Sequence, residues 1–343
     1  MQPKPKCLTL QILLASTALV AATGAAQAQG VSLSGSAEMG IVGGDRVGPD
    51  AFEGVDTDEI NFFADVDVRF TMSGETDGGL RFGVSVDLDE ADNLGDEADN
   101  GGYAVFISGG FGTVTLGDTD GALDRVMIDA ATAGNPGSII DDETEHAGYV
   151  GAFGDGAFDN QVLNYSIETG RVLWSVSYEQ GAGLNGVYEN TDPHGSIGGG
   201  ALLSFPDASD FPKFTPVESM QIALGFLQTE FATGDDQLII GASFGIDFTG
   251  GISAALGYTD WQNVGGVSGL DDSHFYLGVG YDFDRLSLHA NYGEFDSGDS
   301  GFGFAAGYDL GGGASILFGY GSSDRAGSAS DNDTYSLGLQ TNF

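Results

Sequence analysis

Apolar and polar side chains alternate with a period of two along about sixteen segments of this chain. A period of two is typical of β-strands, whose successive side chains point to opposite faces of a sheet. In the last segment, 333–343, Leu337, Leu339 and Phe343 share one face, and Ser336 and Gln340 share the other. An apolar stripe that runs to the last residue is unusual in a soluble domain, where chain ends fray in water. The pattern therefore predicts an all-β fold with one strand face turned to lipid.

The number and spacing of these segments favour a closed ring of antiparallel strands. Short and long connections alternate, as expected when short periplasmic turns face long outer loops. The connection 206–217, with Pro206, Pro212 and Pro216, is longer than this alternation predicts, so it holds an insertion or the neighbouring strand boundaries are off by a few residues. The predicted strands are 31–42, 60–73, 79–90, 102–109, 112–118, 158–168, 171–180, 196–205, 219–229, 236–247, 251–261, 273–282, 285–295, 302–309, 313–322 and 333–343.

The first 28 residues have the features of a cleaved export signal. Lys4 and Lys6 precede an apolar run, and a small-residue cleavage site ends at Ala28. No later run is long and apolar enough for a spanning helix. Cys7, the single cysteine, lies in this segment, which excludes disulfides and thiolate metal sites from the remainder. We expect residues 29–343 to form one domain.

The charge of the chain excludes nucleic acid as a partner. Without the two lysines of the signal, 8 Lys and Arg face 51 Asp and Glu, a formal net charge of −43. Such a surface repels phosphates. The 58 glycines and only eight prolines suit many short strands joined by turns. Composition alone also allows a secreted acidic β-protein.

Charged side chains occupy one face of several predicted strands. In the strand 60–73, Asp65, Asp67 and Arg69 share the face opposite Val66 and Val68. A face this charged cannot be a packed core, because unpaired buried charges cost several kcal/mol each. It must line water, which predicts a barrel with an aqueous lumen. The cations on the inferred inner face are Arg69, Arg81, Arg171 and Arg285. A charged residue on a strand takes the polar side in any case, so this placement alone does not prove a role.

The long connection 119–157 is the main candidate for a functional loop. Loops of this length are uncommon unless they are functional. Folded into the lumen, its acids would face the wall arginines and produce a transverse field, as charge patches do in selective pores. The alternative is an external loop solvated by water. Its candidate acids are Asp120, Asp124, Asp129, Asp141, Asp142, Glu143 and Glu145.

No motif for a cofactor or catalytic centre is convincing. The four histidines lack the ligand spacing of a zinc site. The acids of 141–143 and 331–333 could hold Ca²⁺ but lack a loop with fixed ligand positions, so calcium stays unassigned and no cofactor is expected. A G-x-S-x-G match at 241–245 falls within a predicted strand and not at a strand-to-helix turn.

Four strings resemble the general diffusion porins of Rhodobacter and its alphaproteobacterial relatives: VSLSGSAEMG at 31–40, VRFTMSGETDGGLRFG at 68–83, FGTVTLGD at 111–118 and YDLGGGASI at 308–316. The resemblance implies a homotrimer of sixteen-stranded transmembrane barrels whose third outer loop, here 119–157, folds inward as a constriction. It places Arg69 and Arg81 on the arginine-bearing strands. Basic residues are fewer here than the family pattern has, and the excess of acids favours cations. Phe343 resembles the terminal aromatic read by the outer-membrane assembly machinery.

Together these features predict a passive pore in the bacterial outer membrane, reached through the periplasm, in contact with membrane lipids. Small hydrophilic solutes and ions would diffuse through it, with a preference for cations and without catalysis. Two alternatives remain open at this stage. A lipase-like barrel enzyme would need a Ser/His pair near the lipid boundary. A non-pore acidic adhesin or structural β-protein would not need the short and long alternation of connections.

Overall fold

A computed structural model describes residues 30–45, 60–90, 102–151, 153–154, 161–181, 193–213, 215–328 and 332–343. The predicted export signal, 1–28, lies outside the described residues, as do large parts of the long connections near 43–59, 91–101 and 181–195. None of the described helices is long and apolar enough to cross a membrane. The regular structure of the described residues is almost entirely β.

Each of the sixteen predicted strands is present, with ends that differ from the expected ones by a few residues. The strands are β1 (Gly30–Gly44), β2 (Asn61–Glu75), β3 (Arg81–Glu90), β4 (Tyr103–Gly109), β5 (Gly112–Gly117), β6 (Val162–Thr169), β7 (Val172–Gln180), β8 (Pro193–Phe205), β9 (Val217–Phe231), β10 (Gln237–Phe248), β11 (Ile252–Gln262), β12 (Asp272–Phe283), β13 (Leu286–Phe295), β14 (Ser300–Gly311), β15 (Ala314–Asp324) and β16 (Asn332–Asn342). The short helices are α1 (Ala122–Val126) and the 3-10 turns η1 (Ala130–Thr132), η2 (Ala208–Asp210) and η3 (Val264–Gly266).

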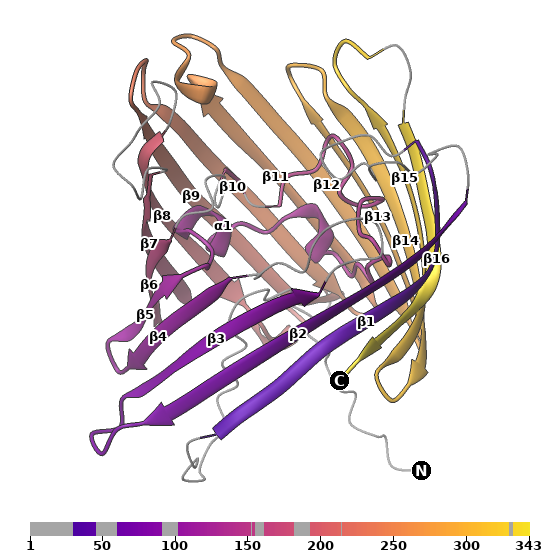
Figure 1. Cartoon of the computed structure of the whole chain (residues 1–343), viewed down its shortest axis with the longest axis horizontal. Helices are drawn as coiled ribbons and strands as arrows, with labels where there is room; N and C mark the ends of the chain where they lie inside the picture. The colour runs from indigo at the N-terminus through magenta and orange to yellow at the C-terminus, as the bar shows by residue number, and fades with distance from the viewer. Residues whose placement is uncertain are drawn as a thin grey trace.

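The strands form one closed antiparallel barrel in chain order, which confirms the predicted fold class (Figure 1). The ring closes where β1 pairs with β16, with Met39 opposite Leu339 and Gly40 opposite Gly338. The Phe343 amide continues this ladder by donating to the Gly35 carbonyl at 2.9 Å. Closure leaves no unpaired edge, as lipid requires, because lipid cannot hydrogen-bond to an exposed strand edge.

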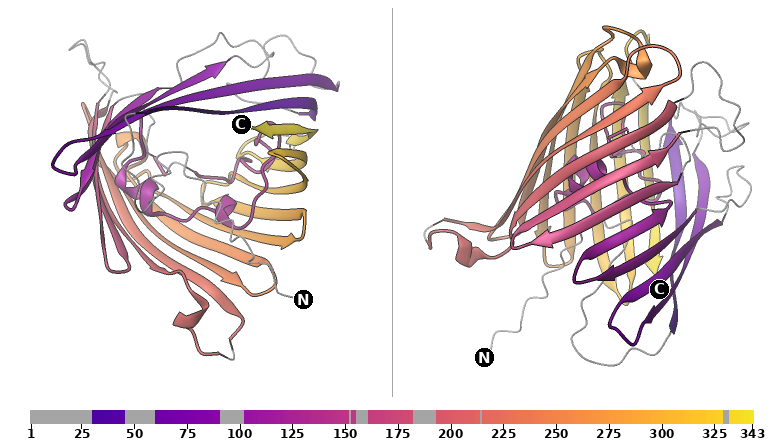
Figure 2. Two further views of the ribbon diagram at one scale, coloured as in Figure 1. Left: turned by 90° about the horizontal axis from the view of Figure 1, so that it is seen from below. Right: turned by 90° about the vertical axis from the view of Figure 1, so that its left-hand side faces the viewer.

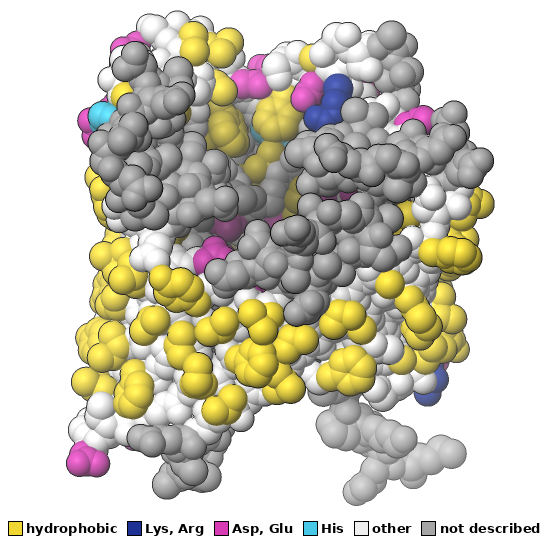
Figure 3. Space-filling model, in the orientation of Figure 1, with side chains coloured by type: hydrophobic (Ala, Val, Ile, Leu, Met, Phe, Trp, Pro, Cys, Tyr) yellow, Lys and Arg dark blue, Asp and Glu magenta, His cyan; other side chains and the backbone are white. Residues whose placement is uncertain are grey.

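The two faces of the wall differ as the alternation predicts. Large apolar side chains point outward and are exposed, among them Phe62, Trp174 and Leu224. Hydrophobic side chains are spread across the outer wall (Figure 3). Small and polar residues such as Ser177 and Ser243 point inward and are buried beneath the segment that follows β5.

The β8–β9 connection is a true insertion. The described residues of this connection, 206–213 and 215–216, contain η2 and project away from the barrel (Figure 2). Arg171 of the neighbouring β6–β7 turn binds both carboxylate oxygens of Asp210, and its guanidinium lies 5.2 Å from the ring centre of Phe205. The strand boundaries near this turn match the prediction closely, so the insertion accounts for the irregular length.

Candidate functional site

The segment after β5 folds back into the barrel and crosses its lumen (Figure 2). Helix α1 lies against the inner faces of β7, β8 and β9. The Ala122 amide donates to Ser177 Oγ at 2.7 Å, and the Ile128 amide donates to Ser243 Oγ at 2.8 Å. Leu123 and Val126 are fully buried. We call residues 118–151 the lumen loop.

Glycines on the inner wall let the lumen loop approach the strand backbone. A Cβ at Gly278 would lie 1.9 Å from the Ala130 carbonyl oxygen, and one at Gly303 would lie 2.4 Å from the Glu143 carbonyl oxygen. Gly200 meets the Val126 side chain in the same way, at 2.4 Å. Any larger residue at these positions would displace the loop, because Cβ atoms do not come this close to other atoms.

The far end of the lumen loop is anchored at the seam where the barrel closes. Ile139 is buried against Val42, Phe63 and Leu317, which come from β1, β2 and β15. Asn291 of β13 donates to the Thr144 carbonyl at 2.7 Å. The loop therefore spans the lumen from β7 to the closing strands.

The candidate acids of the loop do not form one uniform patch. Glu143 is completely buried and accepts a hydrogen bond from Ser138 Oγ. Asp129 caps η1 by accepting from the Thr132 amide, and it also accepts from the Tyr149 hydroxyl at 3.2 Å. Burial raises the pKa of Asp129 above its usual range. These two acids stabilise the loop itself.

The other acids differ in their exposure. Asp141 and Glu145 are exposed, and Asp120, Asp124 and Asp142 are partly exposed. Enclosure by the lumen, followed by repulsion from Asp141 and Asp129, raises the pKa of Glu145 to about 7. The charge of Glu145 therefore changes near neutral pH.

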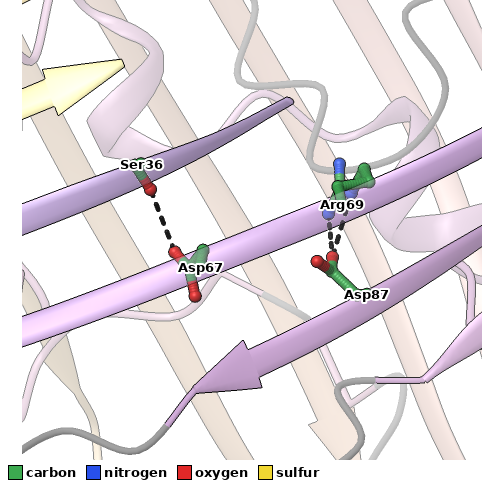
Figure 4. A network of polar contacts seen from close by, with 4 residues as sticks. All are labelled: Ser36, Asp67, Arg69 and Asp87. Carbon is green, nitrogen blue, oxygen red and sulfur yellow. Dashed lines mark hydrogen bonds and ion pairs between the residues drawn. The ribbon is translucent and has the colours of Figure 1, made fainter. Parts of the chain in front are cut away.

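The wall formed by β1, β2 and β3 carries a polar network (Figure 4). Ser36 Oγ donates to Asp67 Oδ2 at 3.1 Å, and Arg69 Nε donates to Asp87 Oδ2 at 3.0 Å. Asp67, Arg69 and Asp87 line one hollow of about 450 Å³. The carboxylate of Asp87 therefore neutralises the positive charge of Arg69 within the lumen wall.

Acids of the barrel wall and of the lumen loop meet beside this network. Asp65 and Asp67 of β2 and Asp141 of the lumen loop act electrostatically on Glu38 of β1. Gln340 of β16 donates to Glu38 Oε1 at 2.6 Å. The strand register explains the cluster, because Glu38 is the direct partner of both Asp65 and Gln340.

Three of the four candidate arginines lie at a strand end or in a turn. Arg81 is the first residue of β3, opposite Ser108 and Glu75. Arg171 and Arg285 each lie one residue before a strand, in the β6–β7 and β12–β13 turns, because β7 and β13 begin one residue later than expected. Only Arg69 lies well within the wall.

Two residues of interest were missed in the sequence reasoning. Arg125 lies in α1, within the loop that was considered for its acids, and its Nε is buried without a hydrogen-bond partner among the described residues. Glu38 faces the lumen from β1. The alternation of β1 places Glu38 on the polar face, so its position could have been found from the sequence; the burial of the Arg125 Nε could not.

The described residues show no arrangement of three or more His, Cys, Asp or Glu side chains suited to a metal ion. The G-x-S-x-G match lies inside β10, where Ser243 supports the lumen loop by accepting from the Ile128 amide. That contact gives Ser243 a structural role.

Residues 15–343 match the family model described as Gram-negative porin. The chain is 28% identical over 314 residues to a porin of Rhodobacter capsulatus, covering 86% of this chain and 94% of the relative. A porin structure refined at 1.8 Å superposes with a TM-score of 0.67 at 23% identity, covering 92% of this chain and all of the other. A mutant of the Rh. blastica porin gives a TM-score of 0.62 at 17% identity, covering 91% of this chain and all of that one. The chain therefore belongs to the Gram-negative porin family.

Proposed function

We propose that this porin forms a water-filled channel through which small hydrophilic solutes and ions diffuse passively, with a preference for cations. The observation that carries the preference is the placement of acids both on the barrel wall and on the lumen loop beside it. Glu38, Asp65 and Asp67 line the wall, and Asp141 of the lumen loop is close enough to act on Glu38. Like charges on facing surfaces raise the local concentration of counter-ions and repel co-ions.

The arrangement of the cations supports the same preference. Arg69 is paired with Asp87 in the wall, and Arg171 is paired with Asp210 at the rim. Each pair is close to neutral as a unit, so these arginines do little to offset the surrounding acids. Arg125 is the cation of the lumen loop itself, and it stands between Asp124 and Asp129 in sequence.

The family and the closed barrel indicate the outer membrane as the location. Porins are channels and not enzymes, and we propose that this chain likewise catalyses no reaction. We further propose export through the periplasm, insertion by the outer-membrane assembly machinery and assembly as a homotrimer. Bound calcium has no assigned position in this proposal.

A bilayer recording tests the proposed function. The purified protein is inserted into a planar bilayer with a KCl gradient, and the reversal potential is measured. We expect stepwise conductance increases and a reversal potential of the sign that marks cation selectivity. An anion-selective sign would contradict the charge argument, and absence of any conductance would contradict the pore.

A further inference from the structure

Two histidines of the barrel wall hold the lumen loop at two points. His289 of β13 donates from Nδ1 to the Ala133 carbonyl oxygen at 2.8 Å. His274 of β12 donates from Nε2 to the Gly148 carbonyl oxygen, also at 2.8 Å. Both side chains are almost completely buried. The two carbonyls bracket the part of the loop that carries Asp141 and Glu145.

A glycine stands next to each of these contacts. Gly280 is the direct cross-strand partner of His289, and a Cβ there would lie 2.1 Å from the Ala133 carbonyl oxygen. A Cβ at Gly293 would lie 1.9 Å from the Gly148 carbonyl oxygen and 3.1 Å from His274 Nε2. We call each combination of a histidine donor and a glycine a seat. The glycine admits the loop backbone and the histidine binds its carbonyl.

The second nitrogen of each ring has no such contact. Nδ1 of His274 and Nε2 of His289 are buried and meet no hydrogen-bond partner among the described residues. The His274 ring stacks on Phe295, with centroids 4.4 Å apart. A proton added to either seated ring would bury a positive charge without an acceptor, which is costly.

The neighbouring titratable groups do not remove this cost. Burial, followed by electrostatic repulsion from His274 and His289, lowers the pKa of His146 in the lumen loop to about 4. Asp272, two residues before His274 on β12, is the acid that acts on His274. Near the seat formed by His289 and Gly280, Asp282 of β12 lies close to Gly134. Its carboxylate oxygen is 3.6 Å from a Cβ built at Gly134.

We propose that the two seats fix the position of the lumen loop against β12 and β13, and that acid releases the loop from them. This inference rests on the proposed pore function, because the loop matters only if the lumen conducts. An imidazole free in water gains its proton near pH 6.5, whereas a seated ring must stay neutral to avoid an unpaired buried charge. Falling pH below about 6.5 therefore favours the released state, and rising pH restores the seats.

The first test compares the wild type with His274→Gln/His289→Asn in single-channel recordings at pH about 7.5 and about 4.5. The amides of Gln and Asn place N–H donors near Nε2 and Nδ1 but do not titrate in this range. We expect a loss of conductance and greater current noise at acid pH in the wild type, because the released loop moves within the lumen and obstructs it. The double variant should be steadier, and since it keeps every acid, the titration of the carboxylates is common to both proteins.

The second test uses the glycines at neutral pH. Gly280→Ala and Gly293→Ala should displace the loop and alter the single-channel conductance. Gly245→Ala is the matched control, because its Cβ would face the lumen loop but meet only side-chain carbons of Ile128, the nearest at 3.3 Å. Heat-dependent migration on gels checks that each barrel has folded, and the histidine comparison stands by itself if a glycine variant does not fold.

The outcomes separate the two proposals. If the wild type forms no channel, the proposed function fails. If it forms a channel whose acid response equals that of the double variant, the proposed function stands and protonation of the two histidines is refuted as the cause of loop release.

Discussion

At the scale of single residues, the charge of the lumen depends on how acids and arginines are paired. Arg69 and Arg171 each bind an aspartate. The two pairs differ in place, because Arg69 and Asp87 lie within the wall whereas Arg171 and Asp210 lie at the rim. They therefore offer a matched comparison of the same interaction inside and outside the channel.

We expect Asp87→Asn to reduce cation preference more than Asp210→Asn does. Asp87→Asn leaves Arg69 without its carboxylate partner inside the lumen. Asp210→Asn leaves Arg171 without its carboxylate partner at the rim. For Asp87→Asn, a change of about 0.2–1 kcal/mol, the range for exposed ion pairs, corresponds to a factor of about 1.4 to five in the cation-to-anion permeability ratio. Reversal potentials of the two variants measure this, and equal shifts would argue against a special role of the wall.

The selectivity should also depend on pH through Glu145. With a pKa raised to about 7, this carboxylate is charged above that value and neutral below it. Cation preference should therefore fall as the pH is lowered from about 8 to about 6. The change should be smaller in Glu145→Gln, which is neutral throughout. A wild type and a variant with parallel pH curves would exclude Glu145 as the titrating group.

At the scale of elements, the lumen loop is held by contacts to strands that are distant in sequence. Its acids look alike in the sequence, yet Glu143 is buried beside Ser138 and Asp129 caps η1, whereas Asp141 and Glu145 are exposed. Sequence alone could place these acids in one long loop. It could not distinguish the structural acids from the exposed ones, because the orientation of each acidic side chain depends on which wall residue the loop contacts.

The variant Ile139→Ala tests whether the lumen loop can loosen without unfolding of the barrel wall. Ile139→Ala should remove about 2–5 kcal/mol of packing against Val42, Phe63 and Leu317 and loosen the loop. Hydrogen exchange of the loop amides should accelerate, while the thermal unfolding of the barrel changes little because its ladder is intact. Ile140→Ala, at a half-buried residue packed against the same cluster, should have a smaller effect. Loss of the whole barrel in the Ile139 variant would show that loop and wall fold as one unit.

At the scale of the whole molecule, the backbone of Phe343 takes part in closing the ring, whereas its side chain is exposed. Phe343 pairs through its backbone with Gly35, and 82% of the residue is exposed. Phe343→Ser should therefore lower the amount of protein inserted in the outer membrane, since we propose that the aromatic is read during assembly. The protein refolded in detergent should still conduct as the wild type does. Reduced conductance after refolding would instead assign the side chain a role in closure.

Alternation along the chain by itself determined the sixteen strands, their inward and outward faces and the closed antiparallel ring. This was possible because each strand meets lipid on one side and water on the other, so its pattern is set locally. Only the tertiary structure decided which strand residues receive the lumen loop, that Arg171 and Arg285 lie in turns, and that Glu38 faces Asp141. Those features depend on the register between strands and on contacts across the lumen, which bring together residues as distant in sequence as Ala133 and His289.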